Sequence, residues 1–410
     1  MSVHIVIGKN FGDEGKGLAT DYFAAQSEKQ GHKCLVIRHN GGGQAGHTVD
    51  LPARRFVFHQ LSAGSFRNAH TYWSKSFLPD LYKLREEADE FAALHGTTPS
   101  VYGHPLCRCV YIDDVLVNMA LESSRGKDRH GSCGMGINEA VTRSAFSDAC
   151  LHLHEVKTMT TRELYDKLLH IRMTYLPRRL QELGLHLEQT GEYGELLANN
   201  NVLYNAAQQM HLSSQAVTLA SEDIVRNYDN IVFEGAQGLL LDENYLLYAP
   251  HLTSSRTGLD NPVHFIRTHL PDTIPEVVYV TRSYITRHGA GPLPYEDCWN
   301  KQNYFVADHT NLTNPWQGKL RFAPHGTKEE FFAAMHSDLQ KHTHPVAVSC
   351  MVTHLNETDE MICSTSGNVS PSQWFCGACV PSQLNYIYLS STPYTKDIRK
   401  MEIEKQSDRT

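Results

Sequence analysis

The sequence predicts an α/β protein with a mostly parallel central sheet flanked by helices, and three observations support that class. Strand-like apolar runs alternate with helical patterns near the N-terminus. Two later runs, "NIVFEGAQG" and "VVYVTRSYITRHGAGPLP", pass from apolar residues into glycine and polar residues, as strands do where they deliver groups to a site. Amphipathic helical patterns lie between these strands. Such alternation implies parallel strands joined by crossover helices.

Each element follows from apolar periodicity and from the residues that end it. The run "HIVIG" predicts a strand closed by glycine, residues 14–31 predict a helix that ends at Gly31, and "KCLVIRHN" predicts a second strand. Residues 78–96 carry an apolar stripe at helical spacing, opposite a charged face. Residues 161–184 predict a further amphipathic helical region, interrupted near Pro177.

Composition limits the classes of protein to consider. With 410 residues, 41 % of them apolar, the chain can form one large domain, which we assign to residues 1–395, followed by a charged, loosely held tail at residues 396–410. The net charge of −8, with both signs interspersed, argues against binding nucleic acid. The sequence contains no membrane-spanning run, and a strand stands where a signal peptide would need a basic and an apolar region. We therefore expect a cytoplasmic protein with small-molecule ligands and no membrane partner.

The ten cysteines are irregularly spaced and predict no disulfide framework. Cys376 and Cys379 form a CxxC, as in a redox pair or half of a zinc site, but no second CxxC follows at ribbon spacing. Cys150, His152 and His154 alternate, so on a strand they would share one face. Such spacing arises by chance in a chain with 24 histidines, and we favour structural roles at both places.

The first strand-to-helix loop, within "VIGKNFGDEGKGLATDY", has the features of a phosphate site. Glycines at positions 8, 12, 15 and 17 let backbone N–H groups approach an anion, and the next helix offers its positive end. Lys16 adds a charge for a terminal phosphate. The spacing is not that of a Walker A motif, because Asn10 stands at the first glycine and Gly17 at the magnesium-binding Ser/Thr position. Asp13 is therefore the candidate metal ligand or base.

A second glycine-rich loop, "RHNGGGQAGHTVD", follows the second strand. Three successive glycines and Gly46 again allow close approach of a ligand, and His47 is placed to act at a reacting oxygen. A single histidine is usually structural. Two glycine-rich loops after consecutive strands, one with Asp13 and one with His47, favour catalysis instead.

These loops carry a resemblance to a known family. "FGDEGKG" and "GGGQAGHTV" closely resemble the two signature loops of adenylosuccinate synthetase, and "VFEGAQGLLLD", "LTSS" and "TRHGAGPLP" resemble its later motifs in the same order. The resemblance runs in patches from residue 4 to about residue 294. It implies a P-loop-NTPase-like α/β fold with helical insertions, a homodimer, and a Mg²⁺-dependent ligase of purine nucleotide biosynthesis. Such enzymes phosphorylate a purine nucleoside monophosphate on its 6-oxo group and then let L-aspartate displace the phosphate.

The resemblance also assigns roles, residue by residue. Asp13 corresponds to the base that also binds Mg²⁺, helped by the carbonyl of Gly46, and His47 corresponds to the acid. The triphosphate is expected at Gly12, Glu14, Gly15, Lys16, Gly17, His354 and Asn356. The acceptor nucleotide is expected at Gln44, Ser132, Arg143, Gln237 and Thr253, with Arg143 matching an arginine that is donated across the dimer interface. Arg287 lies at a matching strand end.

The sequence departs from the family at the aspartate loop. The family's run of arginines is replaced by "HTNLTNPWQGKLRFAP", where Lys319 and Arg321 are the cations. A dicarboxylate requires paired cationic partners, so Thr313 and Arg321 are the candidates and the amine donor is less firmly implied.

The donor-base site departs as well. His354 and Asn356 replace a Lys-x-Asp that reads guanine, and Pro393 replaces a glycine of the turn over that base. Asparagine is not a two-site acceptor, so ATP becomes a plausible donor beside GTP. Phage relatives that join aspartate to dGMP offer a rival acceptor, but they have a smaller residue at Asp13, and retention of Asp13 favours IMP. A non-catalytic nucleotide sensor is a further alternative, although it would not need Asp13 and His47 together.

Overall fold

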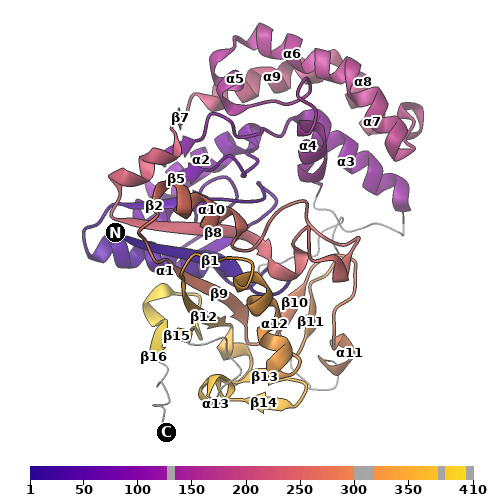
Figure 1. Cartoon of the computed structure of the whole chain (residues 1–410). Helices are drawn as coiled ribbons and strands as arrows, with labels where there is room; N and C mark the ends of the chain where they lie inside the picture. The colour runs from indigo at the N-terminus through magenta and orange to yellow at the C-terminus, as the bar shows by residue number, and fades with distance from the viewer. Residues whose placement is uncertain (127–133, 300–305, 307–317, 377–383, 403–410) are drawn as a thin grey trace.

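The computed structural model describes residues 1–126, 134–299, 306, 318–376 and 384–402. Within these residues one sheet has the strand order β16-β15-β12-β9-β1-β8-β2-β5-β6-β7. All neighbours pair in parallel except the edge strand β16, which runs antiparallel to β15. The predicted class, a mostly parallel sheet flanked by helices, is confirmed (Figure 1).

The bounds of the elements are as follows. The sheet consists of β1 (Ser2–Gly8), β2 (Cys34–Arg38), β5 (His70–Trp73), β6 (Val101–Gly103), β7 (Val217–Leu219), β8 (Asn230–Gly238), β9 (Glu276–Arg282), β12 (Ala347–Thr353), β15 (Leu384–Leu389) and β16 (Arg399–Glu402). Two-stranded pairs are β3 (His47–Leu51) with β4 (Arg54–Phe58), β10 (Ile285–Arg287) with β11 (Arg321–Ala323), and β13 (Ile362–Ser364) with β14 (Gly367–Val369). The helices are α1 (Lys16–Lys29), α2 (Leu81–His95), α3 (Ile112–Arg125), α4 (Ile137–Ser144), α5 (Leu153–Thr158), α6 (Thr161–Thr174), α7 (Leu176–Leu183), α8 (Glu192–Ala198), α9 (Asn200–Ser214), α10 (Asp260–His269), α11 (Glu296–Trp299), α12 (Lys328–Leu339) and α13 (Pro371–Phe375).

Helices cover both faces of the sheet. Successive side chains of β1 point to opposite faces, so Val6 packs with Phe23 of α1, whereas Ile5 belongs to the core beneath α10 and α12. The central strands β1 and β8 are buried on both faces, as expected in a parallel sheet. The carboxyl ends of these strands therefore carry the loops that reach the surface.

A helical lobe stands on one side of the sheet. Helices α3 to α9 form this lobe, at the top of Figure 1. Leu168 of α6 and Ala207 of α9 share one apolar core, and Leu116 of α3 shares another with Leu180 of α7. The predicted interruption near Pro177 is confirmed, because α6 ends at Thr174 and α7 begins with the proline in its first turn.

One sequence expectation is corrected in part. Of the predicted loosely held tail, residues 396–410, Arg399–Glu402 pair with β15 as β16, and residues 403–410 lie outside the described residues. Residues 150–154 do not form a strand with one shared face: His152 caps the N-terminus of α5, and His154 contacts the carbonyl oxygen of Pro105. Among the described residues, no group of three or more His, Cys, Asp or Glu side chains is placed to hold a metal ion. Cys376 is exposed, and Cys379 lies outside the described residues.

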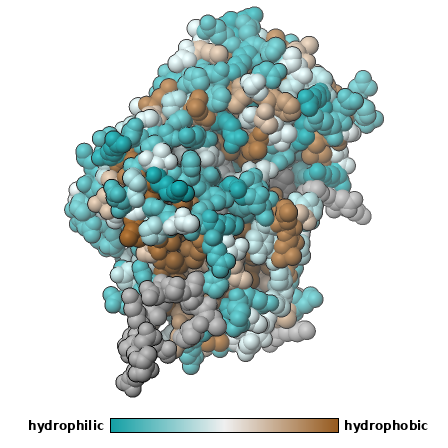
Figure 2. Space-filling model, viewed as in Figure 1, coloured by the Kyte–Doolittle hydropathy of each residue, from teal (hydrophilic) through white to brown (hydrophobic). Residues whose placement is uncertain are grey.

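The surface is consistent with this layered core. Hydrophilic residues cover most of the face shown in Figure 2. None of the described helices combines the length and the apolar character that crossing a membrane requires.

Candidate functional site

A deep cleft lies between the carboxyl ends of the central strands and the helical lobe. Its volume is about 1110 Å³, which exceeds the usual size of a pocket for one small molecule. Most of the predicted site residues line this single cleft: Gly12, Asp13, Glu14, Gly15, Lys16, Gly17, Gln44, Gly46, His47, Gln237, Thr253, Arg287, His354 and Asn356. Residues from six separate motifs are thus brought together in space.

The first loop has a backbone that requires glycine. Gly12 and Gly15 have φ of +97° and +95°, in the left-handed region. A Cβ on Gly15 would lie 2.9 Å from Cγ2 of Thr353, so the loop presses directly on the end of β12. Glu14 is 1 % exposed, and its Oε1 accepts hydrogen bonds from N and Nδ2 of Asn10, at 2.7 and 2.8 Å. The side chain of Glu14 therefore braces the loop, and only its main chain is left to contact a triphosphate.

Lys16 begins α1 and is almost fully buried. Burial lowers its pKa, and the charges of Glu14 and Asp13 oppose that shift. Its Nζ and Oε2 of Glu14 both lie close over Gly8, where a Cβ would meet them at 3.0 and 2.6 Å. An ammonium held in so little solvent gains strongly from an incoming phosphate.

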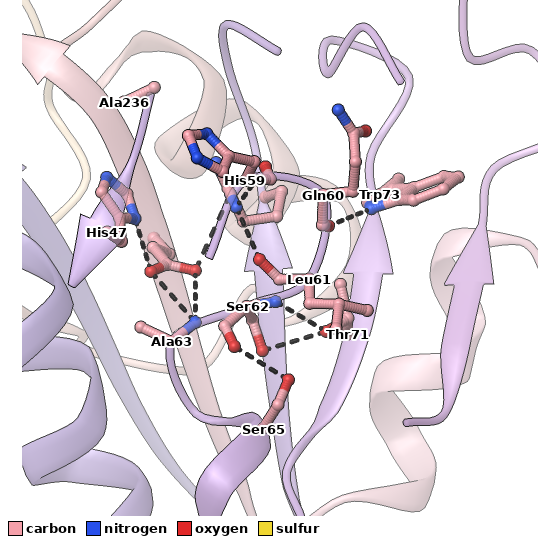
Figure 3. Close-up of polar contacts among 12 residues, drawn as sticks. His47, His59, Gln60, Leu61, Ser62, Ala63, Ser65, Thr71, Trp73 and Ala236 are labelled. Atoms are coloured by element: carbon pink, nitrogen blue, oxygen red, sulfur yellow. Dashed lines mark hydrogen bonds and ion pairs between the residues drawn. The ribbon is translucent and has the colours of Figure 1, made fainter. Parts of the chain in front are cut away.

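His47 sits at the start of β3 with its ring fixed by a buried carboxylate. Its Nδ1 lies 2.6 Å from Oε1 of Glu234, which is fully buried on β8 (Figure 3). Burial favours the neutral acid, but the charges of His47 and Arg38 hold the pKa of Glu234 below its ordinary value. The Nδ1–H of His47 thus donates to an ionised Glu234, and Nε2 has no partner among the described residues.

The side chain of Arg38 and a backbone N–H hold the carboxylate of Glu234 in place. Arg38 is fully buried, with its Nε 3.7 Å from Oε2 of Glu234 and its Nη1 donating to the carbonyl oxygens of His59 and Leu61. The N–H of Ala63 lies 3.3 Å from both Glu234 oxygens. Burial lowers the pKa of His47, and the charge of Glu234 opposes that shift.

Asp13 adopts a left-handed backbone, with φ of 56°. Its carbonyl oxygen accepts a hydrogen bond from Nε of Arg282, and its Oδ2 lies 3.2 Å from Nε2 of His288. The side chain of Asp13 is 30 % exposed, so it faces the cleft from a fixed backbone. Gly46 lines the same cleft and is exposed.

Three of the five residues predicted to bind the acceptor nucleotide lie in the cleft. Gln44, Gln237 and Thr253 line the cleft, and both polar side-chain atoms of Gln44 are buried without a partner among the described residues. Next to them, Oγ of Ser254 donates to Oδ1 of Asn138 at 2.5 Å and joins this wall to α4. The buried polar atoms of Gln44 that have no partner among the described residues are suited to hydrogen-bonding a ligand.

Arg143 does not line the cleft, and its surroundings do not fit the predicted ligand-binding role. It is fully buried inside the lobe, where Nε and Nη2 donate to Oδ1 and Oδ2 of Asp114 at 2.8 and 2.9 Å. Its remaining N–H groups donate to the carbonyl oxygens of Ala149 and Cys109. A guanidinium so enclosed is not available to a partner subunit. Ser132 lies outside the described residues.

Of the residues predicted to bind the amine donor, neither Arg321 nor Lys319 lines the cleft. Arg321 does not line the cleft: it pairs with Glu296 at 2.8 Å and donates to the carbonyl oxygens of Gly289 and Gly291. Lys319 is exposed elsewhere, and Thr313 lies outside the described residues.

Arg287, in contrast, faces the cleft. It donates to the carbonyl oxygens of Pro292 and His251, and its guanidinium lies 4.4 Å from the ring centre of Phe11. Burial, together with repulsion from Arg321, lowers the pKa of Arg287 to about 10. This cation of the predicted set is therefore the one placed to meet a carboxylate.

The donor-base residues lie at one end of the cleft. His354 has a left-handed φ of 58°, and its Nδ1 lies 2.9 Å from Oγ1 of Thr353. Asn356 is exposed, and Thr392 and Pro393 line the same end. The C-terminal segment thus contributes Thr392 and Pro393 to the cleft that His354 and Asn356 also line.

Comparison with known proteins supplies the family. A family model described as adenylosuccinate synthetase matches residues 5–311, about three quarters of the chain. The chain belongs to the adenylosuccinate synthetase family. Curated adenylosuccinate synthetases of Clostridium botulinum and Thermosipho africanus are 28 % and 29 % identical over 302 and 308 residues, which are 72 % and 71 % of this chain. The match spans 66 % of each relative, slightly less than two thirds of its length.

Solved structures show the same fold. The fully ligated adenylosuccinate synthetase from Plasmodium falciparum aligns with a TM-score of 0.61 and 16 % identity, over 98 % of this chain and 87 % of that chain. The cyanophage S-2L succinoaminodeoxyadenylate synthetase, bound to dGMP and dATP as an energy donor, aligns with a TM-score of 0.58 and 14 % identity, over 97 % and 95 %. The fold of this family member therefore extends beyond the residues that the family model matches.

Sequence reasoning missed four side chains that hold the family's loops: Arg282, Glu234, His288 and Thr353. Glu234 had a usable signal, because it is the charged residue inside an otherwise apolar strand. His288 directly follows Arg287 in a glycine-rich turn. Arg282 and Thr353 carry no local signal, because their contacts with the first loop join distant parts of the chain.

Proposed function

We propose that this chain is an adenylosuccinate-synthetase-type ligase. It phosphorylates the 6-oxo group of a purine nucleoside monophosphate and then replaces the phosphate by the amino group of L-aspartate. The observation that carries the proposal is that Asp13 and His47, on two different loops, line one cleft together with Lys16. A carboxylate, an imidazole and a phosphate-binding lysine supply the base, the acid and the anion site that both steps need.

In the first step Asp13 takes the N1 proton of the purine while O6 forms a bond to the γ-phosphorus. The bond from that phosphorus to the bridging oxygen breaks, and a nucleoside diphosphate leaves. His47 donates from Nε2 to the developing charge when its ring is protonated, and the ionised Glu234, which accepts from Nδ1, stabilises this charged ring against the burial that lowers the pKa of His47. Lys16 and the loop amides hold the γ-phosphate.

In the second step the amine nitrogen attacks C6 and inorganic phosphate leaves. The product is an N6-succinyl nucleotide. Arg287 is placed to hold a carboxylate of the amine donor, because it is a buried cation on the cleft wall.

The cleft fits Mg²⁺, which the family implies. Asp13 offers a carboxylate and Gly46 a carbonyl oxygen, and Mg²⁺ is usually bound through one or two carboxylates together with substrate phosphates. When bound, it would neutralise charge on the phosphates of the donor. Asp13 and Gly46 are the residues that would hold it.

Asp13 favours IMP as the acceptor. A carboxylate beside N1 accepts the N1–H of a purine, whereas a 2-amino group would need additional room at this place. The same chemistry on GMP or dGMP is the alternative, and the departures at the donor end of the cleft favour keeping it in the test.

We also propose ATP as the preferred donor. The carboxamide of Asn356 has both a donor and an acceptor, which matches N1 and the 6-amino group of adenine, whereas guanine requires two acceptors. Pro393 lines the same end of the cleft.

A matrix of substrates tests the proposal. IMP, dIMP, GMP and dGMP are each combined with ATP or GTP, L-aspartate and Mg²⁺, and a succinylated nucleotide is scored by mass. We expect product with IMP and ATP. Absence of product in every combination would exclude the ligase, and product with dGMP alone would favour the alternative acceptor.

We further propose that the chain acts as a cytoplasmic homodimer. Sedimentation of the purified protein should give twice the mass of the chain, and a monomer with full turnover would contradict this. Because Arg143 is buried, we expect no contribution of that residue to the partner's cleft.

A further inference from the structure

We propose that His288 is a positioning residue that fixes the carboxylate of Asp13, an inference that rests on the function proposed above. The direct observation is the 3.2 Å separation between Nε2 of His288 and Oδ2 of Asp13. Both residues line the cleft. They come from different parts of the chain, the loop after β1 and the turn after β10.

The strand β10 brings His288 to the loop by a regular alternation. Thr286 donates through Oγ1 to the carbonyl oxygen of Gly12 at 3.1 Å. Alternate residues of an extended chain point to the same side, so His288, two residues later, also faces the loop. Thr286 and His288 therefore contact the first loop from the same side: Thr286 holds the backbone before Asp13, and His288 contacts the carboxylate of Asp13.

The turn after His288 is itself constrained. Gly289 and Gly291 have φ of +73° and +102°, and a Cβ on Gly291 would lie 2.5 Å from Nη2 of Arg287. Arg321 donates to the carbonyl oxygens of both glycines, at 3.0 and 2.7 Å. Hydrogen bonds from Arg321 thus hold the segment that carries His288, although this segment belongs to no helix or strand.

Chemistry assigns the direction of the hydrogen bond. An ionised carboxylate only accepts, so the Nε2–H of His288 donates to Oδ2 of Asp13. The ring then has an acceptor at Nδ1, which is buried without a partner among the described residues. Because Oδ2 of Asp13 accepts the hydrogen bond from His288, Oδ1 is the oxygen left to contact ligands in the cleft.

Fixing one oxygen matters because a general base must be within hydrogen-bond reach of its proton. The backbone of Asp13 is already held at its carbonyl oxygen by Arg282. His288 adds the second anchor, on the side chain, and removes rotation of the carboxyl group. A misplacement of about 1 Å at such a site costs about 100-fold in rate.

Steady-state kinetics of three variants test the proposal. We expect His288→Val to lower kcat about 10- to 100-fold, as loss of an orienting partner commonly does. The KM values for both nucleotides should stay within about threefold, because the loop amides and Lys16 are untouched. His288→Gln, which keeps an N–H donor, should recover kcat to within about fivefold of the native value. His186→Val is the matched control, since His186 is exposed on an extended backbone away from the cleft.

Two results overturn the proposal: native kcat in His288→Val, or equal losses in the Val and Gln variants. Histidine ¹⁵N spectra of the ligand-free protein provide a readout that does not need turnover. We expect one Nε2–H signal that vanishes in His288→Gln and shifts in Asp13→Ala. If the native chain makes no product, the ligase function fails, and these spectra still decide whether the contact exists.

Discussion

At the scale of single residues, Asp13 and His47 decide whether the cleft is catalytic. Each has a dedicated partner, His288 for Asp13 and Glu234 for His47. Under the proposed function, these pairs hold the base and the acid on two different loops of one cleft. The sequence predicted Asp13 and His47 because their glycine-rich loops are local patterns, whereas Glu234 lies 187 residues from His47 along the chain.

Removing either group should abolish turnover with the fold intact. Asp13→Ala removes the base and His47→Asn removes the ring that Glu234 orients, so we expect at least a 100-fold loss of kcat in each. Turnover is measured with the substrate pair that the native chain uses. Unfolding by urea provides the control, and turnover within a few-fold of native in either variant would contradict the assigned role.

Arg143 should prove to be a structural residue. Arg143→Ala leaves the buried carboxylate of Asp114 without its cation, and breaking such a pair costs about 3–5 kcal/mol. We expect that loss in the free energy of unfolding, measured by urea denaturation. Arg162→Ala, at an exposed ion pair with Asp166, should change it by less than about 1 kcal/mol. A raised KM with native stability would restore the ligand-binding role.

Sequence alone could not place Arg143, for a physical reason. Its carboxylate partner lies on α3 and its carbonyl partners lie in other segments, so nothing within its own helix signals burial. Arg287 and Arg321 show the same limit. Both were visible as cations and lie opposite each other on β10 and β11, but their long-range contacts separate them: Arg287 donates to His251 and lines the cleft, whereas Arg321 pairs with Glu296.

At the scale of elements, the parallel strands and their loops were predictable because each is a short local pattern. Strand β8 matches the predicted run from Asn230 to Gly238. Strand β16 was missed because "RKME" has no apolar alternation, and its stability comes from backbone pairing with β15. Residues 152–155 begin a helix, because a capping box at His152 and Glu155 starts α5.

At the scale of elements, a substitution at Gly15 tests whether the close contact between the first loop and β12 is needed for triphosphate binding. Gly15→Ala should weaken triphosphate binding at least tenfold, because the new Cβ meets Thr353 at 2.9 Å and distorts the loop. Gly96→Ala is the matched control: its φ of +84° carries similar backbone strain, with no atom within 4 Å of the added Cβ. Titration with a fluorescent triphosphate analogue measures the affinity. Equal effects in both variants would show that strain, and not the contact with β12, controls the loop.

Asp338 should make the stability of the protein depend on pH, because its carboxyl group connects α12 to β9 and to the residue before α10. On α12, it accepts hydrogen bonds from the N–H of Leu259, before α10, and from the hydroxyl of Tyr279 on β9. Burial raises the pKa of Asp338 to about 6 from an ordinary value of 3.8. The folded state therefore holds the proton more tightly than the unfolded state. Stability from this group is fully present below pH 3.8 and is lost as pH rises through 6.

Asp338→Asn removes that titration. Its Oδ1 keeps the hydrogen bond from the N–H of Leu259, and its Nδ2 can donate to the hydroxyl oxygen of Tyr279, which reverses the second bond. The difference in unfolding free energy, variant minus native, should rise by up to about 3 kcal/mol between pH 4 and pH 7. Urea denaturation at several pH values measures it. A difference that stays constant over this range would show that the carboxyl group titrates alike in the folded and unfolded chains.

At the scale of the whole molecule, the cleft separates recognition into two parts of the chain. Loops within residues 5–311, which match the family model, supply Asp13, Lys16 and His47. Asn356 and Pro393, which we propose contact the donor base, come from residues beyond that match. Under the proposed function, the reacting groups and the donor-binding residues thus come from different parts of the chain.

Asn356→Asp tests this separation, because it replaces one exposed carboxamide by a carboxylate of nearly the same shape and so changes its hydrogen bonding and its charge. A carboxylate accepts from both N1–H and the 2-amino group of guanine and repels the lone pair at N1 of adenine, so preference should move from ATP toward GTP. We expect the ratio of kcat/KM for the two donors to change about 10- to 100-fold, as one hydrogen-bonding mismatch commonly does. Turnover with saturating acceptor and aspartate measures it for each donor. A native ratio in the variant would show that this end of the cleft does not read the donor base, and His354 and Pro393 would then fall outside donor recognition as well.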